Sequence, residues 1–503
     1  MIIKIRKFIN QSYLFSPTNI LFYLLLGFLF SLTQFLTNYF SDGHSIGLLT
    51  LLKGDAYDYI QLTDNLVVNG TYGFGDIPSV YRMPGFTFFY FPFRILLNQN
   101  AAINSLIIFQ FLFSIIAKYY FSLIILKKTN SKFIFLICFI ILCIGSPLIF
   151  FNNILYSESL ASSCLMLASY QLYNFSLTLE NKRLIYSGIF IALMIFLRPF
   201  TGIVIPLLVF FIFQTNKKNI DKNLIKFCLI ILFPFFIVET IWIVRNQIQF
   251  KKFIPLEKSI EGTYCESSYC QWRQLVTRCG ESNVFWNPNT LGTWFASEKF
   301  LNENRIKRPE NDVLPVFLFS KYLTIDSLKK ARDFSNQENL EKYPKQNYEL
   351  EAKRIFQMFD DTLRINHPYK YYIQSSINPV IETFYQTSSP TKNLKYPLNV
   401  LTVLINTFFS SLILLFGPIY LIIHLFIQKK TLDSFSVFFV LFVSSLVFLM
   451  DIMLRDHEGR FILIVYPIFV YFLISVLKKL KYFIAIPFLL SFLIGVLTIL
   501  KMF

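Results

Sequence analysis

Three aspartates follow the first long apolar run of the chain within ten residues. They are Asp55, Asp58 and Asp64 in the stretch KGDAYDYIQLTDNLVVNG, residues 53–70. A carboxylate beside a reacting hydroxyl can accept its proton, and a helix N-terminus stabilises the ionised form that such a general base needs. The plainer alternative is that Asp55 caps a helix and Asp58 completes a capping box. Because a capping carboxylate stays ionised, the two interpretations are compatible.

The pattern of this stretch predicts the helix that would carry these carboxylates. Tyr59, Leu62 and Leu66 recur at helical spacing, and Asn69 with Gly70 forms a stop signal. We therefore expect an amphipathic helix from about Asp55 to Asn69 at the membrane surface. Asp64 is expected to be an ordinary residue of its polar face.

Arginines recur in short motifs that we expect at the same membrane face. Arg82 lies in SVYRMPGF, Arg198 in FLRPF and Arg245 in WIVRN, and Arg455 and Arg460 flank RDHEGR. Guanidinium groups at this depth suit a phosphate, because they form paired, charge-assisted hydrogen bonds to its oxygens. For any single arginine, the alternative is an interfacial anchor whose charged head reaches water.

One acidic residue is expected at the start of a membrane span. Glu158 lies in NNILYSESL, and an ionisable residue entering a span is a candidate functional group, because burial there is costly. The alternative is a first-turn glutamate that favours the helix dipole.

The composition places these residues in a membrane protein. Of the 503 residues 54% are hydrophobic, 60 are Phe, and the mean hydropathy is +0.52. The apolar residues form blocks long enough to cross the ~30 Å of a bilayer's hydrocarbon core. The first block, 19–40, lacks a small-residue cleavage site and is too long for a signal-peptide core, so we expect a retained helix.

The net charge of +17 reflects membrane topology. The short tails and loops that we assign to the inner side hold seventeen Lys and Arg against only Glu180, Asp221 and Asp433. This is the distribution of the positive-inside rule, so no nucleic-acid partner is needed to explain it. With the N-terminus inside, about eleven spans are predicted. They are 19–40, 101–126, 133–151, 155–176, 184–198, 200–214, 224–243, 397–427, 434–454, 461–478 and 482–500.

Two long segments are then expected on the outer side. Segment 41–83 holds five Asp, with Lys53 and Arg82 as its only Lys or Arg. The apolar stretch 84–97 that follows is too short to cross and is expected to be re-entrant or interfacial. The polar segment 244–396 is long enough to form a small extracytoplasmic domain. The predicted parts are therefore 1–243 with an outer catalytic loop at 41–100, then 244–396, and then 397–503.

The seven cysteines divide by location. Four fall in apolar spans and are expected to be small hydrophobic residues. Cys265, Cys270 and Cys279 fall in the outer segment, where one disulfide could form in an oxidising compartment, with the pairing open.

The ordered set of motifs resembles the GT-C superfamily of polyprenyl-phosphate-sugar-dependent glycosyltransferases, which includes protein O-mannosyltransferases and lipid A aminoarabinose transferases. The resemblance rests on GDAYDYIQLTDNLVVNG, YRMPGF, LYSESL, FLRPF, IWIVRNQIQF and GRFILIVYP, along residues 1–260 and 397–503. Segment 260–396 resembles no family in particular. Where the family often has two adjacent acids, this chain has Asp55-Ala56, and this leaves the role of Asp58 open.

The resemblance implies an all-α polytopic membrane fold with interfacial helices in the first outer loop. It implies inverting transfer of a sugar, a hexosyl or pentosyl group, from a polyprenyl-phosphate donor to an acceptor hydroxyl. Asp55 takes the position of the catalytic base, with Asp58 and Glu158 as catalytic or metal-binding neighbours. Arg82 takes the position of the residue that meets the donor phosphate, and Arg198, Arg245 and Arg460 are further candidates. Metal use is left open, because the outer acids could bind a divalent cation but no ligand motif compels it, and the lipid-linked sugar is expected as the donor substrate.

Several questions stay open at this point. A flippase or transporter of lipid-linked saccharides is the alternative from another class, but it should show repeated halves and polar residues midway along its spans. A ligase or polymerase of such saccharides would share the outer site. The sugar is not identified, and the acceptor could be a glycan, a lipid or a protein. The expected location is a bacterial inner membrane, with the N-terminus cytoplasmic and the site extracytoplasmic.

Overall fold

The computed structural model describes most of the chain. The described residues are 8–13, 15–41, 47–50, 52, 55–80, 82–145, 151–216, 223–256, 268–279, 320, 322–384, 398–427, 433–453, 461–479 and 485–500. The chain divides into two compact units. Unit 1 comprises Met1–Glu257, Phe384–Leu446 and Arg460–Phe503, and unit 2 comprises Lys258–Thr383 and Val447–Gly459.

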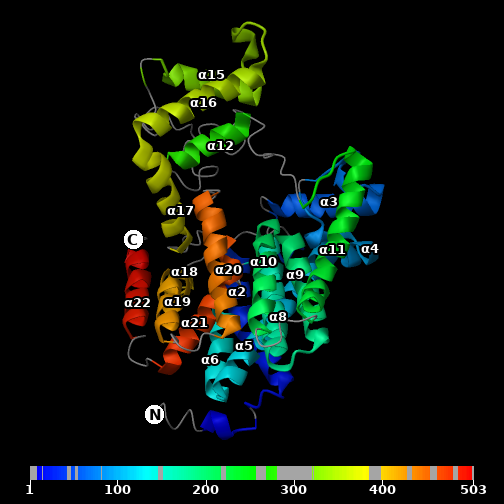
Figure 1. Ribbon diagram of the computed structural model, residues 1–503, viewed down its shortest axis with the longest axis vertical. Coiled ribbons are helices and arrows are strands. Elements are labelled where there is room, and N and C mark those ends of the chain that lie inside the picture. The colour runs from blue at the N-terminus through cyan, green and yellow to red at the C-terminus, as the bar shows by residue number, and fades with distance from the viewer. Residues whose placement is uncertain are drawn as a thin grey trace. The chain divides into compact units, whose positions relative to one another are not determined.

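Unit 1 is a bundle of apolar helices (Figure 1). Every predicted span contains at least one of its helices. In chain order these are α2 (Ile20–Ser41), α5 (Gln99–Thr129), α6 (Lys132–Ile144), α8 (Ser157–Thr178), α9 (Asn181–Leu197), η1 (Pro199–Ile203) with α10 (Val204–Thr215), α11 (Asn223–Phe250), α18 (Leu398–Ser410) with η5 (Ser411–Leu415) and α19 (Gly417–Ile427), α20 (Ser434–Val447), η7 (Phe461–Val465) with α21 (Tyr466–Lys479), and α22 (Ala485–Leu500).

Among the described residues, three stretches of helix are long and apolar enough to cross a membrane by length and composition alone. They are Gln99–Thr129, Asn223–Phe250 and Val403–Phe426, and six shorter apolar helices accompany them. The predicted fold class, a helical polytopic membrane protein, is therefore confirmed.

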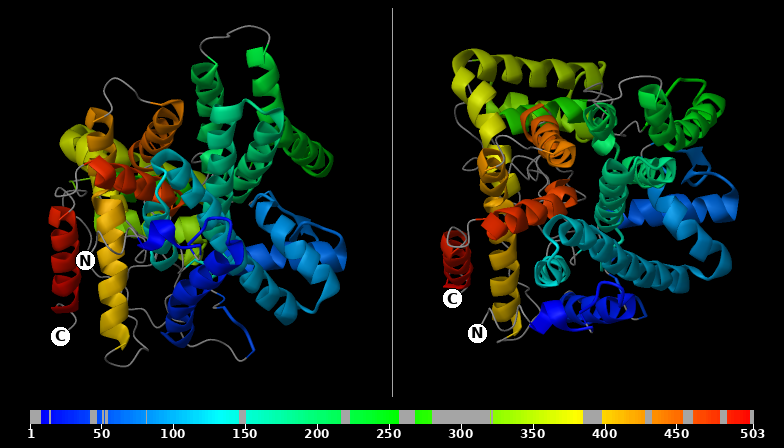
Figure 2. Two further views of the ribbon diagram at one scale, coloured as in Figure 1. Left: turned by 90° about the horizontal axis from the view of Figure 1, so that it is seen from below. Right: turned by 60° about the horizontal axis from the view of Figure 1, so that its bottom comes forward.

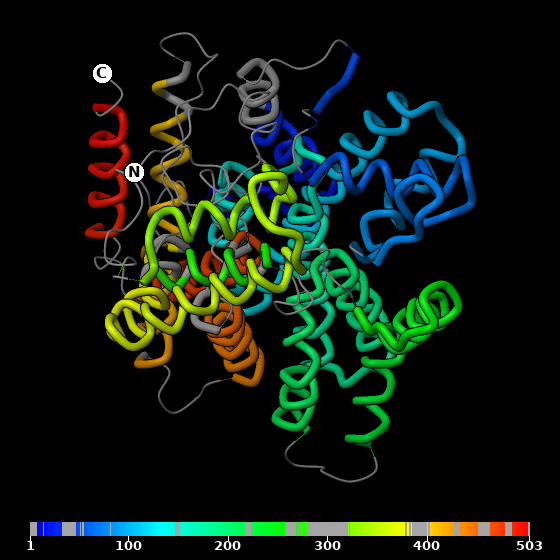
Figure 3. The backbone as a smooth tube through the Cα atoms, turned by 90° about the horizontal axis from the view of Figure 1, so that it is seen from above, coloured from blue at the N-terminus to red at the C-terminus, as the bar shows by residue number. Residues whose placement is uncertain are grey.

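Helix α8 differs from the spans around it. It is rich in serine, and nearly all of its side chains are buried inside unit 1. It packs against α5 and α9, and Figure 3 shows α8, α9, α10 and α11 as one group of neighbouring helices. Because protein rather than lipid surrounds α8, its small polar residues permit close packing without exposing hydroxyl groups to hydrocarbon.

The segment between α2 and α5 folds as two short helices and a hairpin. Helix α3 (Asp55–Asn69) ends at Gly70, whose φ of +70° suits glycine, as the stop signal predicted. Strands β1 (Gly73–Phe74) and β2 (Ile77–Pro78) pair in antiparallel fashion. Helix α4 (Gly85–Leu96) has only twelve residues, about 18 Å, and cannot span a bilayer. It packs against both α3 and α5 (Figure 2).

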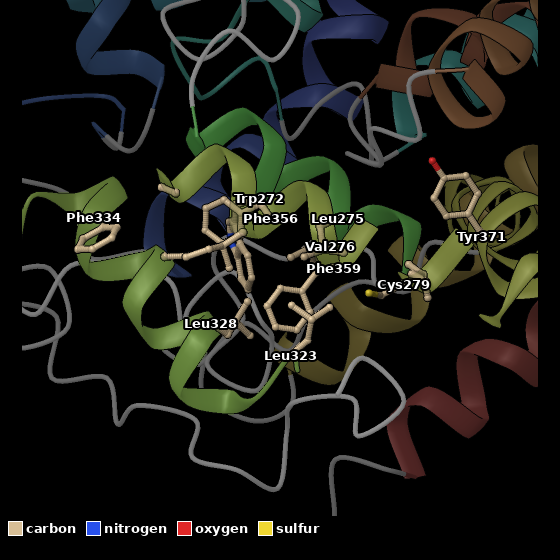
Figure 4. Close-up of a cluster of buried hydrophobic side chains, with 14 residues drawn as sticks. Trp272, Leu275, Val276, Cys279, Leu323, Leu328, Phe334, Phe356, Phe359 and Tyr371 are labelled. Carbon is tan, nitrogen blue, oxygen red and sulfur yellow. The ribbon is translucent and has the colours of Figure 1, made fainter. Parts of the chain in front are cut away.

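Unit 2 has a small core of its own (Figure 4). Its main helices are α12 (Ser268–Arg278), α15 (Ile325–Asn336), α16 (Tyr348–Asn366), η4 (Tyr369–Gln374) and α17 (Ser375–Phe384). Trp272 and Leu275 on α12 are buried together with Phe356 and Phe359 on α16. Cys279 is buried in the same cluster. Cys265 and the side chain of Cys270 lie outside the described part, so the disulfide stays a prediction.

Candidate active site

An ion pair stands at the N-terminus of α3. The helix begins at Asp55, and Arg82 Nη2 lies 2.9 Å from Asp55 Oδ1 and 3.7 Å from Asp58 Oδ2. The three side chains keep 16 to 29% of their surface exposed. A helix N-terminus and a guanidinium both stabilise negative charge, so the place of this pair favours ionised carboxylates. The predicted neighbours Asp55, Asp58 and Arg82 are thus brought together.

Tyr59 forms the floor under this pair. The Arg82 guanidinium lies 5.4 Å from the centre of the Tyr59 ring, which stacks on Phe86 with its centroid 4.7 Å away. The Tyr59 hydroxyl is 3.2 Å from the Ser157 hydroxyl in the first turn of α8. Sequence periodicity identified Tyr59 only as an apolar helix position, whereas its ring and hydroxyl contact two parts of the site.

Hydrogen bonds from Asn65 and Tyr72 fix the hairpin segment that leads to Arg82. Asn65 of α3 donates to the carbonyls of Thr71 and Gly75, at 2.8 and 2.6 Å. The Tyr72 hydroxyl donates to the Arg82 carbonyl at 3.1 Å, and burial raises the pKa of Tyr72, so this phenol stays a donor. The path of the backbone into Arg82 is therefore fixed by hydrogen bonds.

Arg245 holds the same loop from α11. Its Nη1 donates to the Ser79 carbonyl at 2.9 Å and its Nη2 to the Tyr72 carbonyl at 2.8 Å, while its guanidinium also lies over the rings of Tyr72 and Trp242. Arg245 was predicted to meet the donor phosphate, and that role stays a prediction. In this structure its hydrogen bonds position the loop that carries Arg82.

A second carboxylate–arginine pair lies between α8 and α9. Glu158 Oε1 forms an ion pair with Arg198 Nη2, and both side chains are buried, with 1% and 6% of their surface exposed. Glu158 stands in the first turn of α8 and Arg198 directly follows α9. Two residues from separate predicted spans are thus joined as a pair.

A close backbone contact brings the two arginine-bearing segments together. A Cβ placed on Gly85, the first residue of α4, would lie 2.2 Å from the carbonyl carbon and oxygen of Phe196. Only glycine permits this approach, because real Cβ contacts are never that short. The start of α4 therefore packs onto the end of α9, beside Arg198.

Gln110 was missed at the sequence level, although it holds the loop that leads into α8, the helix of Glu158. It is fully buried in α5, and its Nε2 donates to the carbonyls of Phe151 and Ile154 at 2.7 and 3.1 Å. Asn152 in the same loop accepts a hydrogen bond from Ser159, next to Glu158. A lone Gln in an apolar run was the signal that could have identified it.

Asp64 corrects an expectation. It was expected to be an ordinary polar-face residue, but Arg94 Nε donates to its Oδ1 at 2.7 Å and the Tyr90 hydroxyl does so at 3.3 Å. Gln99, the first residue of α5, donates to Oδ2. Asp64 therefore ties α3 to α4 and α5, because one carboxylate can accept from several donors at once.

Other predicted residues stay untested. Arg455 and Arg460 lie outside the described residues. Among the residues that the structure describes, no group of three or more His, Cys, Asp or Glu is arranged to hold a metal ion. Asp55 and Asp58 are two carboxylates with an arginine between them, and binding of a divalent cation by them remains a prediction.

Two solved structures are similar to this chain. The oligosaccharyltransferase of Archaeoglobus fulgidus in the apo form matches with a TM-score of 0.48 and 12% identity, over 94% of this chain and 55% of that one. ArnT from Cupriavidus metallidurans in the apo state matches with a TM-score of 0.35 and 11% identity, over 89% and 76%. The chain spans about half the length of the archaeal enzyme.

No family model and no curated protein matches the chain. At identities of 12% or less the two structural similarities assign no activity, so function is argued below from the residues of this chain.

Proposed function

We propose that this protein is a membrane glycosyltransferase that moves a sugar from a polyprenyl-phosphate donor to an acceptor hydroxyl, with inversion. The observation that carries the proposal is the Asp55–Arg82 pair at the N-terminus of α3, 2.9 Å apart and partly exposed. One group of this pair can accept a proton and the other can bind a phosphate.

Asp55 would act as the general base. As the acceptor oxygen attacks the anomeric carbon, its proton passes to the carboxylate and the bond from carbon to phosphate oxygen breaks. A phosphate is already a good leaving group, so no general acid is required if a cation stabilises the developing charge. A hydrolase acting on a glycosidic bond would instead use two carboxylates that flank the bond.

Arg82 would bind the donor phosphate. A guanidinium offers several N–H donors in a fixed plane and matches phosphate oxygens well. The buried Arg198, already paired with Glu158, is a further proposed contact of the donor near the start of α4, where N–H groups of its guanidinium would donate to the phosphate while the pair stays together. Arg245 and Arg460 are further proposed contacts of the donor, and Asp58 and Glu158 are proposed as catalytic or metal-binding neighbours.

The membrane would carry the donor's lipid tail, since a polyprenyl chain stays in the bilayer while its head group reaches the site. Helix α5 bears Gln99, which contacts Asp64, at one end and the basic pair Lys127–Lys128 near the other, about 43 Å away along the helix. Together with the positive-inside rule, this supports a site for Asp55 on the outer face. A bacterial inner membrane, and a glycan, lipid or protein acceptor, are part of the proposal.

The test is a transfer assay with the purified protein in lipid nanodiscs. A panel of polyprenyl-phosphate sugars is supplied with candidate acceptors, and donor loss and product mass are measured. We expect one donor to be consumed by the wild type and by Asp76→Asn, a matched control at an exposed aspartate of the hairpin. Asp55→Asn should be inactive.

Two outcomes would contradict the proposal. Transfer by Asp55→Asn at the wild-type rate would remove the assigned base. Movement of intact donor across the bilayer, with no sugar transferred under any condition, would favour the flippase alternative.

A further inference from the structure

Tyr59 contacts several residues of the candidate site, although no role there was predicted for it from the sequence. It is buried in α3, one helical turn after Asp55. Its ring supports the Arg82 guanidinium on one side, at 5.4 Å, and stacks on Phe86, at 4.7 Å. Its hydroxyl reaches Ser157, the residue before Glu158. One side chain thus contacts both Arg82 of the partly exposed pair and the residue that precedes Glu158 of the buried pair.

We propose that Tyr59 is the positioning residue of the donor-phosphate site, and that it acts through Arg82. This inference rests on the proposed function. The aromatic face holds the guanidinium at one height while its N–H groups change partners, from the carboxylates of Asp55 and Asp58 to the phosphate of the donor. No covalent bond changes in this step, and the guanidinium keeps its charge.

Anions compete for the one cation of the Asp55–Arg82 pair. Arg82 Nη2 lies 2.9 Å from Asp55 and 3.7 Å from Asp58, so two carboxylates already face a single positive charge. A phosphate that enters competes with Asp55 and Asp58 for the guanidinium. An arginine held only by carboxylates would be free to follow them, whereas one that also lies on an aromatic face loses less order when it binds a new anion.

The rigidity of the ring makes Tyr59 suited to this role. Its ring is fixed by Phe86, which is buried beside Gly85 at the start of α4. The hydroxyl contact with Ser157 fixes the other end of the side chain. Because a tyrosine has only two side-chain torsions, two such contacts leave its ring a single orientation. The height of Arg82 is thus set by helices α4 and α8 together.

The first test compares four variants in the transfer assay. Tyr59→Leu removes the platform, Tyr59→Phe keeps the ring but loses the hydroxyl, and Tyr59→Trp keeps an aromatic face. Tyr57→Leu is the matched control, because Tyr57 lies two residues away on α3 and is 55% exposed. We expect Tyr59→Leu to raise the KM for donor about tenfold, in line with a cation–π contact of ~1 to 2 kcal/mol. The KM for acceptor should not change.

The conservative variants give the rescue readout. Tyr59→Phe should raise the donor KM about threefold or less, since the ring remains, and Tyr59→Trp should lie between the wild type and Tyr59→Leu. Tyr57→Leu should leave the donor KM unchanged. A loss of kcat alone in Tyr59→Leu, with an unchanged donor KM, would overturn the proposal.

A double-mutant cycle tests whether Tyr59 acts through Arg82. Arg82→Gln should itself raise the donor KM, and adding Tyr59→Leu to it should raise the KM no further, because the supported group is already gone. Additive effects of the two substitutions would overturn the proposal. If wild type transfers sugar and Asp55→Asn does not, these outcomes refute the role of Tyr59 while the proposed function stands. If wild type transfers no sugar, the proposed function itself fails.

Discussion

Two carboxylate–arginine pairs of unit 1 share their chemistry and differ in exposure. Asp55 and Arg82 keep 20% and 16% of their side-chain surface open, whereas Glu158 and Arg198 keep 1% and 6%. A partly solvated pair can exchange its partner for a ligand at small cost, because water compensates the separated charges. A buried pair cannot, because each partner would leave an uncompensated charge behind. The first pair suits ligand binding and catalysis, and the second suits a fixed frame.

The largest effect is expected from removing the carboxylate of the partly exposed pair Asp55–Arg82. Asp55→Asn should lower the transfer rate about 10² to 10⁴-fold, the usual contribution of a general base. The free energy of unfolding should change by less than about 1 kcal/mol, because the lost ion pair is partly exposed. Single-turnover transfer and thermal unfolding in detergent measure the two quantities. Unfolding of Asp55→Asn at a much lower temperature would show that the two pairs do not differ as described.

The buried pair should respond in the opposite way. Glu158→Leu or Arg198→Leu alone should lower the free energy of unfolding by about 3 to 5 kcal/mol, because each leaves a buried charge without its counter-ion. The double substitution should regain most of that loss. The melting temperature of the purified protein in nanodiscs reports both. Equal melting temperatures for the single and double variants would contradict the assignment of a buried, mutually neutralising pair.

The contact that joins the two regions should be sensitive to a single methyl group. Gly85→Ala would place a carbon 2.2 Å from the Phe196 carbonyl, so α4 and the end of α9 must separate. We expect a loss of about 1 to 3 kcal/mol of stability, as for other overpacked sites, together with a raised donor KM. Gly75→Ala in the hairpin, where no atom lies near the added carbon, is the comparison for crowding, although its φ of +59° adds backbone strain. A stable Gly85→Ala with normal kinetics would show that this approach is not required.

The smallest effect concerns the support of α3. Asp64→Asn keeps the size of the side chain but weakens three hydrogen bonds, of which the one from Arg94 is charge-assisted. A loss of about 1.5 to 3 kcal/mol is the usual range for hydrogen bonds to charged groups, and partial exposure places this one at the lower end. Hydrogen exchange in α3 should increase while transfer changes only slightly. If α3 of Asp64→Asn exchanged hydrogen at the wild-type rate, Asp64 would be an ordinary residue of the polar face after all.

Much of the fold was predictable because lipid imposes simple rules. A stretch such as residues 224–243 must be helical and apolar to cross hydrocarbon, and α11 is both. The C-terminal end of α3 was predictable from Asn69 and Gly70, since Gly70 can adopt a positive φ, and its start was predicted at or beside Asp55. Helix α8 was predicted as a span, but its burial inside unit 1 was not predicted. No local pattern in the sequence shows that other helices surround a serine-rich helix.

The reactive groups of the candidate site were predictable from the sequence, whereas the residues that position them were not. Asp55 and Arg82 stood out because charge is rare in such a chain. Tyr59, Gln110 and Gly85 did not, because each has a common structural explanation as a core residue, a lone polar residue or a turn. Their importance depends on contacts with residues far away in the chain, and periodicity carries no information on those contacts.

The sequence by itself determined that this chain is a helical membrane protein. It also showed that acids and arginines gather at the helix ends opposite the Lys-rich loops. This follows from hydropathy and charge, which act through composition and short-range order. Only the tertiary structure decided which acid pairs with which arginine, which pair is buried, and that Tyr59 lies beneath Arg82. Those features depend on the packing of α3, α4, α8 and α9, because burial changes the free energy needed to separate a carboxylate from an arginine.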